Sequence, residues 1–269
     1  MRIVACSTVL AFALVTRGAL ADGPSPKPAP TALMATTVAD LKSNDASKLR
    51  AALDDVRMGG KANAHLAPTI ADLLQRGLPL SLTEAAVTTL GDLENEAGST
   101  VLASYAQHRS LKVRQAAVRS LIKTKGAVAI RALRRGLSDP DPMIRGVAAN
   151  GLGVLKAKDA LLDLSVALDH GINEAAISIG VLCGPAECDA LSGRLGKLPF
   201  DVVSGGLDQA LFRADLAEDS KIKIIGKMRE LGTAEANKYL RDAQKRAGSL
   251  SPRLKQAIDQ AVSATPGGA

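Results

Sequence analysis

Aromatic residues and cysteines are scarce in this chain of 269 residues. It contains no tryptophan, two tyrosines, three phenylalanines and three cysteines. A core with so few aromatic side chains must be built from Ala, Leu, Val and Ile, which requires thin, closely packed elements. Long runs of alternating β-branched and aromatic residues are missing too. The sequence therefore predicts an all-α fold.

Motifs for catalysis and metal binding are also missing. The chain has no Gly-x-Ser-x-Gly elbow, no phosphate-binding loop and no His-Glu-x-x-His helix. Its three histidines, His65, His108 and His170, are widely separated, and none is followed by glutamate. We therefore predict that the protein is not an enzyme and that it has no catalytic residue, no metal site and no cofactor.

The beginning of the chain has the pattern of a cleavable signal peptide. Residues 1–21 combine a basic residue near the start, an uncharged run and a small-residue ending at Ala21. The run is too short to span about 30 Å of hydrocarbon, so we expect no transmembrane segment after cleavage. This pattern predicts export to the periplasm or the secreted space. Residues 22–37, with alternate prolines, are predicted to form a linker, 38–264 the folded body and 265–269 a disordered tail.

A repeat dominates the folded body. Three nine-residue stretches follow one another at intervals of 31 residues, and they cover residues 82–90, 113–121 and 144–152. Each has an apolar first residue, small apolar residues at the fourth and fifth positions and leucine at the ninth. A weaker copy, 172–180, follows after 28 residues, as if the preceding turn had lost three. A period of this length predicts an α-solenoid, in which antiparallel helix pairs stack into a superhelix.

One unit carries a family resemblance. Residues 132–153 contain a first helix ending in Leu137, an Asp-Pro-Asp turn, an apolar residue followed by Arg145, and then Ala-Ala and Leu-Gly. This unit resembles a HEAT repeat of the short bacterial type, which also occurs in phycobiliprotein lyases. The likeness covers residues 62–212 best, and the helices on either side are expected to be caps or degenerate repeats.

The resemblance implies roles for several residues. In HEAT repeats of this type, the turn aspartate and the second-helix arginine form a ladder of hydrogen bonds between units, which here implies Arg114, Asp139 and Arg145. His108 stands at the aspartate position one unit earlier, so the ladder is expected to be broken there. We also expect Asp139 to cap the following helix, with Pro142 in its first turn.

A second column of residues is expected to face a partner. The repeat spacing places four polar side chains at one equivalent position of successive second helices: Thr88, Arg119, Asn150 and Ser178. The second helices of a solenoid line its concave face, where partners commonly bind. The sequence therefore predicts a non-catalytic scaffold that binds a protein partner. A lyase-like enzyme is a lesser alternative, supported by fold analogy alone.

The charge distribution raises a rival hypothesis. The formal net charge is +7, and removal of the signal peptide lowers it to +5. From Asp219 onward there are ten basic and five acidic residues. An alternative function is therefore electrostatic binding to an anionic envelope polymer or membrane surface through Lys221, Lys223 and Lys227. Nucleic acid is not a predicted partner, because no aromatic residues interleave with the basic clusters.

Two cysteines remain after removal of the signal peptide. Cys183 and Cys188 are separated by four residues at a turn between two predicted helices. In an oxidising compartment this spacing favours a disulfide that closes a small loop. Two buried free thiols, or a metal-binding or reactive-thiol role, are the alternatives.

Overall fold

The computed structural model describes residues 30–264, which form a row of helices. Within this range there is no β-strand, and an isolated bridge joins Leu195 to Leu198. The α-helices are α1 (Pro30–Asp40), α2 (Ala46–Gly59), α3 (Ala67–Gln75), α4 (Leu80–Asp92), α5 (Ser99–Tyr105), α6 (Leu111–Thr124), α7 (Gly126–Gly136), α8 (Pro142–Val154), α9 (Leu161–Asp169), α10 (Glu174–Leu182), α11 (Pro185–Ser192), α12 (Phe200–Phe212), α13 (Glu218–Leu231), α14 (Ala234–Arg246) and α15 (Pro252–Ser263). Short 3-10 helices cover Gly60–Leu66, Glu96–Gly98, Lys158–Ala160 and Ala247–Ser249. The predicted all-α fold is confirmed.

The first helix corrects the predicted linker. α1 begins at Pro30, so residues 30–37 are helical although the sequence places them in the linker. Proline at the start of a helix is compatible with helical geometry, because the first turn needs no hydrogen bond from that nitrogen. Thr37 is buried, and Val38 packs against the core. The predicted signal peptide, the rest of the linker and the C-terminal tail lie outside the described residues.

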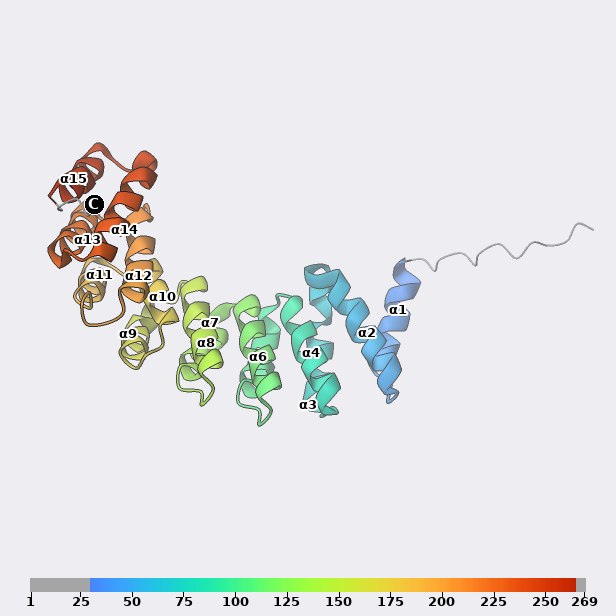
Figure 1. Cartoon of the computed structure of the whole chain (residues 1–269). Coiled ribbons are helices and arrows are strands. Elements are labelled where there is room, and N and C mark those ends of the chain that lie inside the picture. Colours follow the sequence, from blue (N-terminus) through green and yellow to red (C-terminus); the bar gives the residue numbers. More distant parts are fainter. Residues whose placement is uncertain (1–29, 265–269) are drawn as a thin grey trace, which may run out of the picture.

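The helices form two layers (Figure 1). The first helices of successive pairs, α3, α5, α7, α9 and α11, alternate along the chain with the second helices α4, α6, α8, α10 and α12. Each second helix packs on the next one along the row, and α2 packs on α4. Helices α13, α14 and α15 pack against one another at the C-terminal end. This arrangement confirms the predicted α-solenoid.

Leucines at the ninth position of the repeat lie in the core. Leu90, Leu121 and Leu152 are fully buried in α4, α6 and α8. Alanines of the same helices are buried beside them, including Ala117 and Ala148. Small side chains allow the two layers to approach closely, so a chain with few aromatic residues still forms a continuous core.

Glycines bring the second helices into close contact. A methyl group at Gly151 of α8 would lie 2.7 Å from a side-chain carbon of Ile122 in α6, and one at Gly153 would lie 2.5 Å from the hydroxyl of Ser178 in α10. Between α10 and α12 the approach is closer still, because Gly180 meets the backbone of Gly206. Within residues 30–264, the first helices α3, α5 and α7 also pack on one another, but less extensively than the second helices do. The layer of second helices is therefore the tighter one. We refer to its exposed surface as the inner face.

A left-handed residue ends three of the second helices. Glu94, Lys125 and Lys156 follow α4, α6 and α8 at intervals of 31 residues, and all three have positive φ, between 50° and 62°. Such a residue directs the next backbone N–H toward the unpaired carbonyls of the last helical turn. After α8 the N–H of Ala157 accordingly donates to the carbonyl of Leu152 at 3.0 Å. The turns after α4 and α8 each continue into a short 3-10 helix, whereas α7 begins directly after Lys125. Within residues 30–264, no helix is long and apolar enough to cross a membrane.

Candidate functional site

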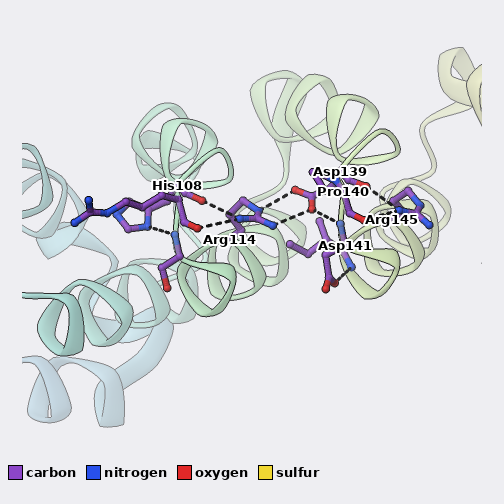
Figure 2. Close-up of polar contacts among 9 residues, drawn as sticks. His108, Arg114, Asp139, Pro140, Asp141 and Arg145 are labelled. Atoms are coloured by element: carbon purple, nitrogen blue, oxygen red, sulfur yellow. Dashed lines mark hydrogen bonds and ion pairs between the residues drawn. The ribbon is translucent and has the colours of Figure 1, made fainter.

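The arginines expected to form the ladder hold the turns between first and second helices (Figure 2). Arg114 donates from Nε and Nη2 to the two carboxylate oxygens of Asp139, at 3.0 and 3.2 Å. Its Nη1 donates to the carbonyl of His108 at 3.1 Å. Arg145 donates to the carbonyls of Asp139 and Pro140 at 2.9 and 3.0 Å. The structure thus brings together all three residues of the expected ladder.

The ladder differs from the expectation in two details. The carboxylate of Asp139 pairs with Arg114 of the preceding repeat, and Arg145 contacts the backbone carbonyl of Asp139 instead. The residue that caps α8 is Asp141, whose side chain accepts a hydrogen bond from the N–H of Ile144 at 3.1 Å. Asp139 lies two residues before this cap and accepts a hydrogen bond from the N–H of Asp141 at 2.9 Å. Both aspartates in the turn are suited to capping, so the sequence left that choice open.

His108 replaces Asp139 in the preceding turn. Its Nδ1 accepts a hydrogen bond from the N–H of Ser110 at 3.0 Å, which repeats the backbone contact of Asp139. In α4, the second helix one repeat before α6, Thr83 stands where Arg114 stands in α6. Its hydroxyl donates to the carbonyls of Leu78 and Pro79. The turn geometry therefore persists without an ion pair. These polar groups serve the scaffold, so the candidate binding surface lies elsewhere.

The predicted inner column is accessible in three of its four positions. Arg119 and Asn150 are exposed, and Thr88 is half-buried with its hydroxyl bonded to the carbonyl of Glu84. Ser178 corrects the prediction: it is 1% exposed and donates to the carbonyl of Ala149 at 2.8 Å. It therefore holds α10 against α8 and cannot contact a partner.

Ser178 is buried because the fourth repeat is shifted by one residue relative to the predicted alignment. In α6, the buried Ser120 donates to the carbonyl of Val87, 33 residues earlier, whereas Ser178 donates to a carbonyl 29 residues earlier. The fourth repeat has therefore lost four residues, about one helical turn, instead of three. Ile177 consequently occupies the position equivalent to Arg119 and Asn150.

The observed register of α10 places an apolar side chain on the inner face where a polar one is predicted. Ile177 in α10 is 45% exposed and Val154 at the end of α8 is 59% exposed. Large exposed apolar residues on neighbouring helices are typical of interaction surfaces. In α6, by contrast, Lys112 and Arg119 are exposed and charged. The inner face is therefore basic at α6 and becomes apolar toward α10.

The three C-terminal lysines do not form one charged surface. Lys221 is 5% exposed, and burial lowers the pKa of its ammonium group from the ordinary value of 10.5. Lys227 pairs with Glu230 at 3.2 Å, and Lys223 is exposed. Lys221 lies on the side of α13 that packs against the fold. Lys221 therefore cannot take part in binding an anionic surface as the hypothesis requires of all three lysines.

The structure joins Cys183 and Cys188 by a disulfide between the end of α10 and α11. Both residues are buried. Arg213, which follows α12, donates to the carbonyls of Gly180 at 3.0 Å and Cys183 at 2.5 Å. The disulfide and Arg213 together close the end of α10. Among residues 30–264, no group of three or more His, Cys, Asp or Glu side chains could hold a metal ion.

Comparison with known proteins supports the repeat assignment. Residues 67–153 match the family model of HEAT repeats. This segment is therefore similar to HEAT repeats. The match ends at the last residues of α8, before the repeat that has lost a helical turn. No curated protein matches the sequence.

Solved structures resemble these HEAT repeats at low sequence identity. The complex of CpcE and CpcF of phycocyanin lyase from Nostoc sp. PCC7120 is 19% identical, with 94% of this chain and 99% of that chain covered and a TM-score of 0.45. A designed armadillo repeat protein is 15% identical, with 86% and 98% covered and a TM-score of 0.40. An engineered protein is 16% identical, with 85% and 67% covered and a TM-score of 0.40. Such similarity assigns no function.

The prediction that the chain is not an enzyme is corrected by this comparison. The phycocyanin lyase complex contains chains of similar helical organisation, so the absence of familiar catalytic motifs does not exclude an enzyme. The low identity, in turn, does not extend lyase activity to this chain.

Proposed function

We propose that this HEAT-repeat chain is an exported protein that binds a protein partner in the cell envelope or secreted space through the inner face of its second helices. The carrying observation is the exposed apolar pair Val154 and Ile177 on that face, beside Asn150. Exposed aliphatic side chains on a rigid concave surface favour contact with another protein. The export component rests on the pattern of residues 1–21.

The inner face can be tested with matched charge insertions. The variant Val154→Glu/Ile177→Glu places two carboxylates on it. The control Leu162→Glu/Val166→Glu makes the same chemical change on α9, a first helix, where the two residues are 77% and 48% exposed. The altered side chains are exposed in each case, so both variants should remain folded, which circular dichroism will check.

An affinity pull-down from the envelope fraction compares the two variants, with the chain from residue 22 as bait. The proposal expects a partner that is captured by the unaltered chain and by the α9 control, and lost with the inner-face variant. Capture that survives the inner-face variant, or disappears equally with the control, contradicts the proposal. Mass spectrometry of the exported protein should also show a first residue of Asp22.

A further inference from the structure

A cleft of about 630 Å³ lies where the repeats meet the C-terminal helices. Lys156 and Lys158, in the turn after α8, line one side of it. The end of α10 contributes Val181, α12 contributes Phe212, and α14 contributes Arg246. A volume of this size is in the range of ligand-binding clefts, and such clefts commonly lie between structural units.

The acidic groups of the cleft are already neutralised. Asp208 receives hydrogen bonds from Arg246 at 2.6 and 3.1 Å and from the hydroxyl of Tyr239 at 2.9 Å. Asp215 lies 2.6 Å from Nε of Arg213. The other nitrogens of Arg213 donate to the end of α10, as described above. The aspartates and arginines of the cleft therefore cancel in charge.

Lys156 and Lys158 are the cations left over. Both are exposed, and among residues 30–264 neither ammonium group has a hydrogen bond or an ion pair. The two residues are close in sequence and line the same side of the cleft. The cleft therefore carries a net positive charge of two, which favours an occupant with carboxylates.

The floor of the cleft is apolar. Val181 and Phe212 are half-buried, and the guanidinium carbon of Arg246 lies 4.4 Å from the centre of the Phe212 ring. This contact holds the ring in place. Val154 lies two residues before Lys156, and Ile177 lies about one helical turn before Val181. The apolar floor thus continues onto the inner face, over a length that suits an extended chain better than a compact small molecule.

We propose that this cleft binds an acidic segment of a partner polypeptide, with an apolar side chain on Val181 and Phe212 and carboxylates at Lys156 and Lys158. The inference rests on the proposed function, and it names the chemistry of the partner. Charge complementarity sets the orientation of such a segment, and burial of its apolar side chain adds affinity.

The test uses charge reversal at a position where the fold accepts it. Glu94 occupies the left-handed turn position equivalent to Lys156, so Lys156→Glu preserves the turn. The test variant is Lys156→Glu/Lys158→Glu. The control, Lys125→Glu/Lys197→Glu, makes the same change in net charge, including one at the equivalent left-handed position, with exposed residues that do not line the cleft.

Fluorescence anisotropy measures binding of a labelled peptide in which Leu and Phe alternate with Glu and Asp, at about 0.1 M salt. The expected result is binding by the unaltered chain and the control, with Kd raised about tenfold or more in the test variant. A matched peptide with Lys in place of every acid should instead bind better to the test variant than to the unaltered chain.

Three results overturn this proposal: no binding of the acidic peptide to the unaltered chain, equal weakening by the control, or preferential binding of phosphatidylserine vesicles through the same lysines. The pull-down separates it from the proposed function. If the partner is lost with Val154→Glu/Ile177→Glu and retained with Lys156→Glu/Lys158→Glu, the inner face binds the partner and the cleft does not.

Discussion

The carbonyls at the end of a second helix obtain their hydrogen bonds differently in the repeats from α4 to α8 and in the helices from α10 to α12. In the first region each second helix ends with a left-handed residue, as at Lys125 and Lys156, and the turn satisfies its own carbonyls. In the second region α10 ends at Cys183, whose φ is −60°, and Arg213 supplies the missing donors from 30 residues away. The disulfide then holds the turn. A local, repeatable solution is thus replaced by a long-range one.

The contacts between second helices differ in the same way. Between α4 and α6, the hydroxyl of Ser120 donates to the carbonyl of Val87 at 3.0 Å. Between α10 and α12, Gly180 and Gly206 bring the two backbones together without side chains. The first contact tolerates small adjustments of a side chain, whereas the second leaves no room for one. We therefore expect the region from α10 to α12 to be the more sensitive to substitution.

Gly180→Ala should have the largest effect. The added methyl group would overlap the carbonyl oxygen of Gly206, and a backbone cannot move aside as a side chain does. We expect a loss of about 3 kcal/mol in the free energy of unfolding, measured by urea denaturation. Gly226→Ala in α13 is the control, because nothing lies within 4 Å of the new methyl group. That variant should gain up to about 1 kcal/mol from helix propensity, and equal losses in both would contradict the comparison.

Removal of the disulfide should come next. Cys183→Ala/Cys188→Ala opens a short loop in the unfolded chain, which corresponds to a loss of about 2 kcal/mol. Hydrogen exchange should become faster in α10 and α11 and stay unchanged in α4 and α6, because each unit of a solenoid contacts mainly its neighbours. Reductant should produce the same change in the unaltered chain and none in the variant. Uniformly faster exchange would show that the two regions unfold as one.

A comparison of two arginines separates the contribution of the ion pair to stability from that of the hydrogen bonds to backbone carbonyls. Arg114 and Arg145 both donate to backbone carbonyls of their turns, but the ion pair with Asp139 belongs to Arg114. Arg114→Gln should therefore destabilise the chain by about 1.5 kcal/mol more than Arg145→Gln in urea denaturation, because it leaves a mostly buried carboxylate unpaired. Equal losses would mean that the ion pair adds nothing to the coupling of the two repeats.

The buried lysine of α13 should give the smallest effect, of opposite sign. Burial lowers the pKa of Lys221, with Arg213 acting in the same direction and Glu218 and Asp215 against it. Lys221→Met should raise the free energy of unfolding by about 1 kcal/mol near pH 7, because it removes the cost of a buried charge. The exposed Lys223→Met is the control and should change little.

The effect of Lys221→Met should depend on pH in a defined direction. Between the lowered pKa of Lys221 and its ordinary value of 10.5, the unfolded chain binds more protons than the folded one, so the unaltered protein gains stability as pH rises. The advantage of the variant should therefore shrink as the pH rises toward 10.5. A constant advantage would point to packing instead of charge.

Much of the fold could be predicted from the sequence. The 31-residue spacing correctly places Leu90, Leu121 and Leu152 in the core, and the helix pairs follow from it. The spacing fails at Ser178, because Ala175 and Ala176 can be aligned with the small residues of α8 in two registers. Both registers look alike in sequence, and the hydrogen bond from Ser178 to Ala149 distinguishes them.

The candidate site was less accessible to prediction. The inner-face residues Arg119 and Asn150 could be found from the repeat, whereas Ile177 was missed because of the register. Lys156 and Lys158 carried no signal, because their importance depends on the acids beside them being neutralised by arginines from other helices. An alignment that allows for the loss of four residues in the fourth repeat would have identified Ile177. The end of α10 at Cys183 marks the same loss of a helical turn.

Short-range information in this chain specifies helices, their apolar sides and the turns that end them, because hydrogen bonding and capping involve residues within a few positions of one another. The burial of Lys221, the register of α10 and the charge of the cleft depend on contacts between distant segments. Arg246 neutralises Asp208 from 38 residues away, and so leaves Lys156 and Lys158 as the free cations of the cleft. No local pattern encodes such a contact, because it exists only after the helices have packed.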